Sequence, residues 1–225
     1  MRPGCCGPIG GSGPIGTELY VRTGPSMPVE GGFLKHTLSV GWEEQGGGRA
    51  LFFNQEQDAA WIVDLSLSNI YNHGQHSDKF ARLDNVLVPN SAGTATRVPR
   101  VNVTVASLNR TLFNYGVGRD WYLLGGNGNC GCDGADKGAA WKVGFDGGGR
   151  WGSAKIELHE LKHRTDVITA AYAALHTDVE IPWGCCIWTF GLRLEWDYTW
   201  MQILQGRNDT HLQDANFLVN FGVRF

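Results

Sequence analysis

The chain has 225 residues, which is long enough for one large domain or two small ones. Its formal net charge of −3 gives no indication of nucleic-acid binding or of a polybasic membrane patch. Thirty-two glycines and nine tryptophans, set against only three methionines, favour strands and turns over helices. No apolar run reaches about 18 residues, so the sequence predicts no transmembrane helix.

Large apolar residues alternate with polar or small ones along much of the chain. This period of two is typical of β-strands whose two faces meet different surroundings. In chain order, the pattern covers residues 38–53, 59–72, 100–107, 113–125, 141–151, 165–181, 187–203 and 216–225, with 100–107 and 165–181 as its weaker members. Residues 17–23 (TELYVRT) add a possible further strand. We therefore predict an all-β, mainly antiparallel protein with eight to ten strands.

The segment IWTFGLRLEWDYTWMQI, residues 187–203, shows the alternation most clearly. From Trp188 to Trp200 every second residue is bulky and apolar, and the residues between them include Arg193, Glu195 and Asp197. Strands of soluble sandwiches usually have about 5–6 residues, whereas a tilted membrane-spanning strand needs about 9–11. The long predicted strands therefore favour an up-and-down transmembrane β-barrel whose apolar side chains face lipid.

The polar faces of these strands combine glycine with charges of both signs. A barrel interior needs small residues for space and opposite charges that pair, because an unpaired buried charge costs several kcal/mol. The sequence suggests the pairs Glu43 with Arg49, Asp146 with Arg150, and Arg193 with Glu195. The predicted lumen residues are Glu43, Gln45, Arg49, Asp64, Asn114, Asp120, Lys142, Asp146, Arg150, Arg193, Glu195 and Asp197.

Aromatic residues gather near the ends of the predicted strands. Membrane barrels place tryptophan and tyrosine at both membrane–water interfaces, in belts called aromatic girdles. The predicted membrane-facing and girdle residues are Trp61, Trp121, Trp141, Trp188, Trp196, Tyr198 and Trp200; Tyr71 and Tyr122 also lie near strand ends.

The C-terminus carries a further pattern, since the chain ends in phenylalanine with apolar residues at alternate positions before it. Phe221, Val223 and Phe225 resemble the terminal strand of bacterial outer-membrane β-barrels, which the barrel-assembly machinery recognises. The stretches GGGRALFFN, YGVGRDWYLL, GGGRWG and LRLEWDYTWMQIL are similar to an uncharacterised family of porin-like outer-membrane barrels. The resemblance implies a location in the outer membrane of a diderm bacterium, with the lipid bilayer and the assembly machinery as partners.

Residues 17–225 are expected to form the barrel, preceded by a disordered Gly-, Pro- and Cys-rich segment at 1–16. That segment has no apolar core, so a signal peptide is not expected within this chain. With eight strands counted from residue 38, the connections 73–96 and 125–138 fall at the same end as the termini, where membrane barrels usually have short turns. A strand at 17–23 would reverse the order and move both connections to the opposite end.

The interior of a barrel with about eight strands is just filled by side chains. Two interpretations of the lumen stay open: a closed ion-pair network that stabilises the barrel, or a narrow pore lined by the same charges. A different class of protein is also possible, namely a soluble ligand-binding barrel or sandwich, lipocalin- or lectin-like, with apolar side chains inside.

The motif HELKH, residues 159–163, suggests an enzyme instead. It matches the zinc peptidase pattern, in which His159 and His163 bind zinc from one helix and Glu160 acts as general base. Glu180 is the only attractive third ligand. Alternating strands flank the motif on both sides, however, and leave no room for a long active-site helix. We therefore predict no catalytic residue, no metal and no cofactor.

Two other features have weak functional signals. GNGNCG, residues 126–131, has glycines at dinucleotide-binding spacing, but no helix follows it, and the nearby Asn and Asp residues lack the spacing of an EF-hand. The six cysteines form the close pairs 5–6, 130–132 and 185–186, which do not match the usual zinc spacing. A disulfide between the last two pairs is possible in an oxidising compartment.

Overall fold

The computed structural model describes residues 15–75, 81–89, 95–125, 138–159, 161, 163–183, 186–203 and 211–225. It contains ten strands and one short helix in these ranges. Their bounds are β1 (Ile15–Glu30), α1 (Gly32–Thr37), β2 (Gly41–Phe53), β3 (Ala59–His73), β4 (Ala81–Pro89), β5 (Ala95–Val103), β6 (Val105–Leu124), β7 (Ala140–Leu158), β8 (Arg164–Trp183), β9 (Cys186–Trp200) and β10 (His211–Arg224).

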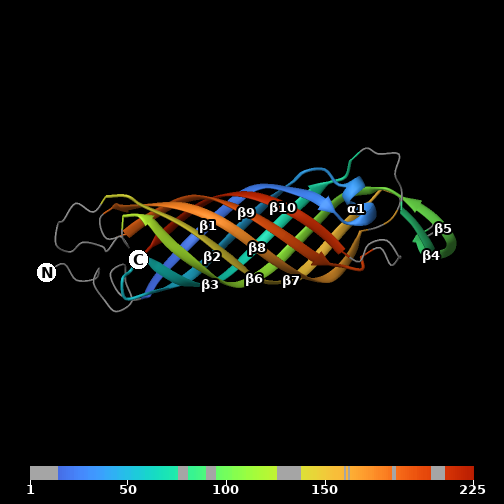
Figure 1. The fold of residues 1–225 in the computed structure, drawn as a ribbon. Coiled ribbons are helices and arrows are strands. Elements are labelled where there is room, and N and C mark those ends of the chain that lie inside the picture. Colours follow the sequence, from blue (N-terminus) through green and yellow to red (C-terminus); the bar gives the residue numbers. More distant parts are fainter. Residues whose placement is uncertain are drawn as a thin grey trace.

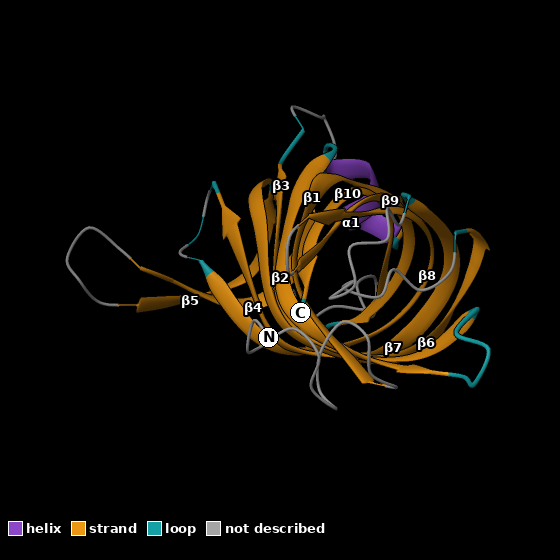
Figure 2. Cartoon of the chain, turned by 90° about the vertical axis from the view of Figure 1, so that its left-hand side faces the viewer, coloured by secondary structure: helices purple, strands orange, loops and turns teal. Residues whose placement is uncertain are grey.

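Eight of the strands form a closed barrel in the order β1-β10-β9-β8-β7-β6-β3-β2. Every neighbouring pair in the barrel is antiparallel, and β1 closes the barrel by pairing with β10. Figure 2 shows this closed ring of strands nearly end-on. The prediction of an all-β antiparallel barrel with about eight strands is thus confirmed.

Two of the predicted strands take different places from those expected. Residues 17–23 belong to β1, which is a full barrel strand. Residues 100–107 do not form a barrel strand of their own, because β5 ends at Val103 and β6 begins at Val105. β5 pairs only with β4, in a separate two-stranded hairpin. The barrel still has eight strands, because β1 is a barrel strand and the predicted strand at residues 100–107 is not.

The barrel has two distinct ends, which we call the terminal rim and the hairpin rim. At the terminal rim lie the beginning of β1 and Phe225, whose amide donates to the carbonyl of Thr17 over 3.0 Å. The opposite rim carries α1 and the β4–β5 hairpin (Figure 1). The connection between β3 and β6 leaves from the hairpin rim, away from the termini. The connection between β6 and β7 leaves from the terminal rim. A first strand at 17–23 was expected to place both long connections, 73–96 and 125–138, at the end opposite the termini. This is correct for the first connection and wrong for the second.

The two faces of the barrel wall differ sharply in chemistry. Outward positions are exposed and mostly apolar, whereas charged side chains occupy inward positions along most of the barrel. Near the hairpin rim the inward positions become apolar, and α1 closes this end with Leu34, which is fully buried. We call this cluster the apolar plug; its buried members are Leu34, Leu38, Ile70, Val103, Val105, Leu108, Leu112, Ala154, Ile156, Leu158, Ile168, Met201, Ile203 and Leu212.

Within the described ranges, no helix has the length and apolar content required to cross a membrane.

Candidate functional site

The lumen holds the largest concentration of ionisable side chains in the described part of the chain. All twelve residues that the sequence suggested for it face inward, and each is at most 5% exposed. Seven further charged residues and one histidine are buried beside them: Glu18, Arg22, Arg110, Asp178, Glu180, Asp214, Arg224 and His176. These were missed because most belong to β1, to the weakly alternating β8, or to strand parts outside the predicted ranges.

The lumen charges form three groups along the barrel axis. The terminal layer, nearest the terminal rim, consists of Glu18, Arg49, Asp120, Lys142, Asp178, Glu180 and Arg224. Nζ of Lys142 lies 3.0 Å from Oδ2 of Asp120 and 3.0 Å from Oε1 of Glu180. Glu180 also receives the Arg224 guanidinium at 2.9 Å. Each cation in this layer therefore contacts at least one acid, and Lys142 joins two strands on opposite sides of it.

The central layer consists of Arg22, Asp64, Asp146, His176 and Arg193. Arg193 donates two hydrogen bonds to Asp146, at 2.5 and 2.7 Å, a bidentate geometry that suits a planar guanidinium. His176 places its ring nitrogens 2.7 Å from Asp120 and 3.2 Å from Asp146. It therefore links the central layer to the terminal layer.

The hairpin layer lies directly below the apolar plug and contains Glu43, Arg110, Arg150, Glu195, Asp197 and Asp214. Arg150 contacts three acids at once: Glu43 at 3.3 Å, Asp197 at 2.8 Å, and Glu195 through a short hydrogen bond. Arg110 donates to Asp214 over 2.5 Å. The four acids of this layer thus share its two arginines. Glu195 forms a further ion pair with Arg193 of the central layer, at 2.8 Å.

Two of the three ion pairs suggested by sequence proximity are wrong. Arg49 pairs with Glu18 and Asp178, not with Glu43. Asp146 pairs with Arg193, not with Arg150. The pair Arg193–Glu195 is present. Inward side chains of a closed barrel reach across the lumen. Most of the ion pairs therefore join residues on strands that are not neighbours in the sequence.

Glycines provide the space for this packing. Gly116 and Gly148 are directly paired across β6 and β7, and Tyr172 on β8 is paired with Gly148. A Cβ atom on Gly116 would lie 2.0 Å from the Tyr172 hydroxyl oxygen, so the ring covers this glycine. The Tyr172 ring is also 4.9 Å from the Arg150 guanidinium carbon and 5.6 Å from that of Arg193. The aromatic ring therefore fills the glycine gap and separates two cations.

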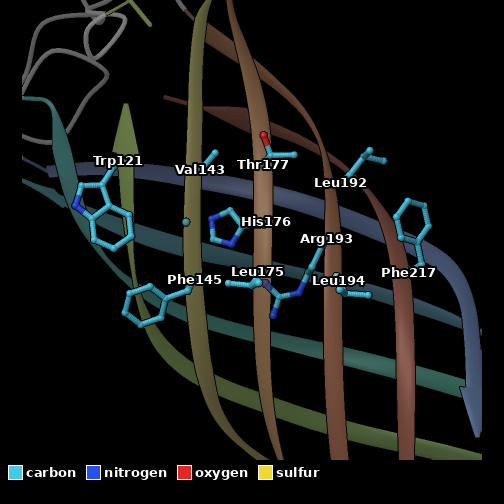
Figure 3. Close-up of a pocket in the computed structure, with 11 residues that line it drawn as sticks. Trp121, Val143, Phe145, Leu175, His176, Thr177, Leu192, Arg193, Leu194 and Phe217 are labelled. Carbon is cyan, nitrogen blue, oxygen red and sulfur yellow. The ribbon is translucent and has the colours of Figure 1, made fainter. Parts of the chain in front are cut away.

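All seven aromatic residues predicted to face the membrane lie on the outer face. Trp61, Trp121, Trp141, Trp196 and Trp200 are exposed, while Trp188 and Tyr198 are half-buried against neighbouring rings. Tyr122, by contrast, points inward, where its hydroxyl donates to Glu180 at 3.1 Å. An apolar groove crosses the outer face over β6–β10, and Figure 3 shows its side chains together with the lumen residues His176 and Arg193.

The HELKH segment does not have the geometry of a zinc peptidase. His159 directly follows β7 and His163 directly precedes β8, so the two lie at a strand connection rather than on one helix. Both are exposed, and Glu160 lies outside the described residues. Glu180 is buried in the terminal layer, 17 residues along β8 from His163, or about 56 Å at ~3.3 Å per residue. It cannot complete a metal site with these histidines.

Several features with weak signals fall outside the described residues, namely residues 1–14, the GNGNCG stretch at 126–131, and every cysteine except Cys186. Cys186, at the beginning of β9, carries a free thiol.

Taken together, these observations define a closed eight-stranded antiparallel barrel with an ionic interior, an apolar exterior and a plug at one end. Solved structures that resemble it include Neisserial surface protein A (NspA), with 9% sequence identity and a TM-score of 0.45 over 93% of this chain and 95% of that one. Another is Ail, the attachment invasion locus protein of Yersinia pestis, in complex with the heparin analogue sucrose octasulfate. Its identity is 8% and its TM-score 0.38, over 94% of this chain and 99% of that one.

No protein-family model matches the chain. No curated protein matches it either.

Proposed function

We propose that this protein is an integral, non-catalytic β-barrel of the outer membrane of a diderm bacterium, with a sealed lumen. The observation that supports this most strongly is the orientation of the wall: bulky apolar side chains face outward, and ionised ones face inward. A soluble ligand-binding barrel needs the opposite arrangement, with an apolar cavity and a wetted polar exterior.

The apolar exterior has the height that a bilayer requires. On β9, seven consecutive outward residues from Trp188 to Trp200 are large and apolar. Trp200 lies 12 residues after Trp188, which corresponds to about 40 Å along the strand and about 28 Å along the normal at a tilt of ~45°. This agrees with the apolar band of about 25 Å that membrane barrels present to lipid.

Aromatic side chains lie at both borders of this band. Phe52 and Trp61 are paired near the terminal rim, and Trp42 and Tyr71 are paired on the same two strands toward the hairpin rim. Near the terminal rim, the outward Arg119 guanidinium carbon lies 5.2 Å from the Trp61 ring and 5.4 Å from the Trp121 ring. A cation stacked between two indoles suits a membrane–water interface, where its charge can reach phosphate and water. These positions support two aromatic girdles.

A structural barrel fits the lumen better than a narrow pore. The described charged side chains pair with one another across the interior, and the apolar plug covers the hairpin layer. Leu34 from α1 and Leu108, Ile156 and Leu212 from three barrel strands are all fully buried in the plug. A conducting path would have to cross both the ionic layers and this dry cluster, so we propose that the closed protein does not conduct.

The C-terminal strand supports recognition by a barrel-assembly machinery. Phe221 and Val223 lie on the outer face of β10, and Phe225, directly after the strand, is exposed as well. They lie beside β1, where the barrel closes. In the unassembled chain this strand would present a continuous apolar face to a partner.

Two measurements test the proposed function together. The protein is expected to require detergent for extraction and to migrate differently in SDS electrophoresis before and after boiling, because a closed barrel resists SDS at ambient temperature. In planar bilayers the wild-type protein is expected to give no conductance steps. Detergent-free solubility would contradict the membrane assignment, whereas reproducible steps would contradict only the sealed lumen.

The apolar band can be tested by one substitution. Leu194→Arg places a charge on the outer face near the middle of β9, where Leu194 is 56% exposed. A charge at the bilayer midplane should reduce the free energy of folding into lipid vesicles by about 2–4 kcal/mol. The matched control is Val167→Arg near the hairpin-rim end of β8, which should have little effect because it lies beyond the band. Equal effects of the two substitutions would argue against lipid contact at Leu194.

A further inference from the structure

The lumen carries more negative than positive charge. Its buried acids number ten: Glu18, Glu43, Asp64, Asp120, Asp146, Asp178, Glu180, Glu195, Asp197 and Asp214. Its buried bases number seven: Arg22, Arg49, Arg110, Lys142, Arg150, Arg193 and Arg224. The excess is 10 − 7 = 3 negative charges, or two if His176 between Asp120 and Asp146 is protonated. Uncompensated charge at this depth is costly, so something must balance it.

The imbalance is concentrated in the hairpin layer. In the central layer, Asp64 and Asp146 face Arg22 and Arg193, so the charges balance. In the terminal layer four acids face three bases, with His176 beside them. The hairpin layer has four acids against two arginines, a deficit of two positive charges. Asp197 and Asp214 are moreover directly opposite one another on β9 and β10, an arrangement of like charges that is destabilising on its own.

Several oxygen atoms in this layer have no hydrogen-bond partner among the described residues. They include Oε2 of Glu43, Oδ1 of Asp197, Oδ1 of Asp214 and Oδ1 of Asn216, all on fully or almost fully buried residues. The Asn216 side chain points into the cluster, because its amide donates to Asp197 over 2.7 Å. The hydroxyl of Ser26, directly opposite Asn216 on β1, is also buried and unpartnered. The arginine donors of this layer therefore leave these oxygens unsatisfied, and Nε of Arg110 and Nε of Arg150 also have no partner among the described residues.

We propose that the hairpin layer binds one calcium-class divalent cation. Carboxylate oxygens of Glu43, Glu195 and Asp197 lie within 4.8 Å of one another, close to the ~4.6–5.2 Å that separates two oxygens on opposite sides of a calcium ion. The Arg150 guanidinium contacts all three acids, so the ion would bind beside it and share these carboxylates with it. The ligand set consists of oxygen alone, which selects hard cations over zinc or copper. One divalent ion also equals the missing charge of the layer.

The ion would act as a structural part of the barrel, taken up during folding. The apolar plug covers the layer on one side and the charged lumen side chains fill the other, so exchange in the folded state should be slow. The proposal does not depend on the membrane assignment, because the charge count and the unpartnered oxygens are properties of the interior.

The test uses the full chain refolded into detergent micelles with calcium or with EDTA. After removal of free ions, elemental analysis should find about one calcium per chain in the first sample. Calcium present at about 100 times its Kd should raise the folded-to-unfolded ratio in urea by about 100-fold. The double variant Asp197→Asn, Asp214→Asn should lose both effects, so that it binds no calcium and its urea midpoint is the same in calcium and in EDTA. The control Asp64→Asn, in the balanced central layer, should keep the calcium response.

Equal urea midpoints in calcium and in EDTA, with no bound calcium, would overturn the proposal and assign the missing charge to protons. A calcium response that persists in the double variant would also overturn it. If the double variant does not fold, the wild-type comparison of calcium with EDTA remains decisive.

Discussion

Replacing Arg150 with methionine is expected to destabilise the barrel by about 3–5 kcal/mol, the range seen when one partner of a buried ion pair is removed. Arg150 is the cation that contacts Glu43, Glu195 and Asp197 together, and its side chain is fully buried. Methionine keeps much of the side-chain volume but removes the arginine contact of Glu43 and of Asp197, while Glu195 keeps only Arg193 at 2.8 Å. The measurement is the free energy of unfolding from urea titration of the folded fraction in micelles.

The matched control is Lys155→Met, which removes a cation from an exposed pair. Lys155 lies 2.9 Å from Glu157, but about half of each side chain is exposed. Exposed pairs typically contribute about 0–1 kcal/mol, so this variant should be nearly as stable as the wild type. An Arg150→Met protein with the urea midpoint of the Lys155→Met protein would show that the hairpin layer is not held by its arginine.

A methyl group at Gly148 is expected to be the most disruptive small change in the barrel wall. The Cβ atom of Gly148→Ala would lie 1.9 Å from the carbonyl oxygen of Tyr115 and 2.6 Å from the Cα atom of Gly116. Both contacts are with backbone, so β6 and β7 must separate locally. Overpacking of this kind typically costs about 1–3 kcal/mol, and Gly148→Val should cost more.

Gly46→Ala provides the control for this prediction. Gly46 also lies in a run of three glycines, but a Cβ atom there has no heavy atom within 4 Å. The substitution should be neutral or slightly stabilising, because alanine restricts the unfolded chain more than glycine does. If the two alanine variants unfold at the same urea concentration, the glycines of β7 do not serve close strand contact.

The alternation along β9 and β10 was enough to assign the barrel class, because side-chain direction in a strand depends only on position. A residue such as Arg193 must face away from Leu192 and Leu194, whichever strands lie beside it. The strand boundaries could not be predicted around residues 100–107, because the alternation continues without a break from the β4–β5 hairpin into the barrel strand β6. Alternation cannot report the interruption at Thr104, since both parts have the same period.

The ion pairs could not be read from the sequence. Glu43 meets Arg150 across 107 residues of sequence, and Arg49 meets Asp178 across 129. Such partners are set by the closure of the barrel, which brings non-neighbouring strands together inside a narrow space. The candidate cation layer depends on the same closure, because its acids come from β2, β9 and β10.

The sequence determined which face of each long strand is apolar, and with it the barrel class, because this property is local and repeats every two residues. Tertiary structure alone decided the apolar plug. Leu112, Ile156 and Ile168 lie on the inward faces of β6, β7 and β8, which farther from the hairpin rim carry charged or titratable residues, and the docking of α1 with Leu34 makes this end of the lumen dry. Whether an inward side chain contacts charged or apolar groups depends on the strands and the helix that pack around it. That packing is a property of the whole barrel.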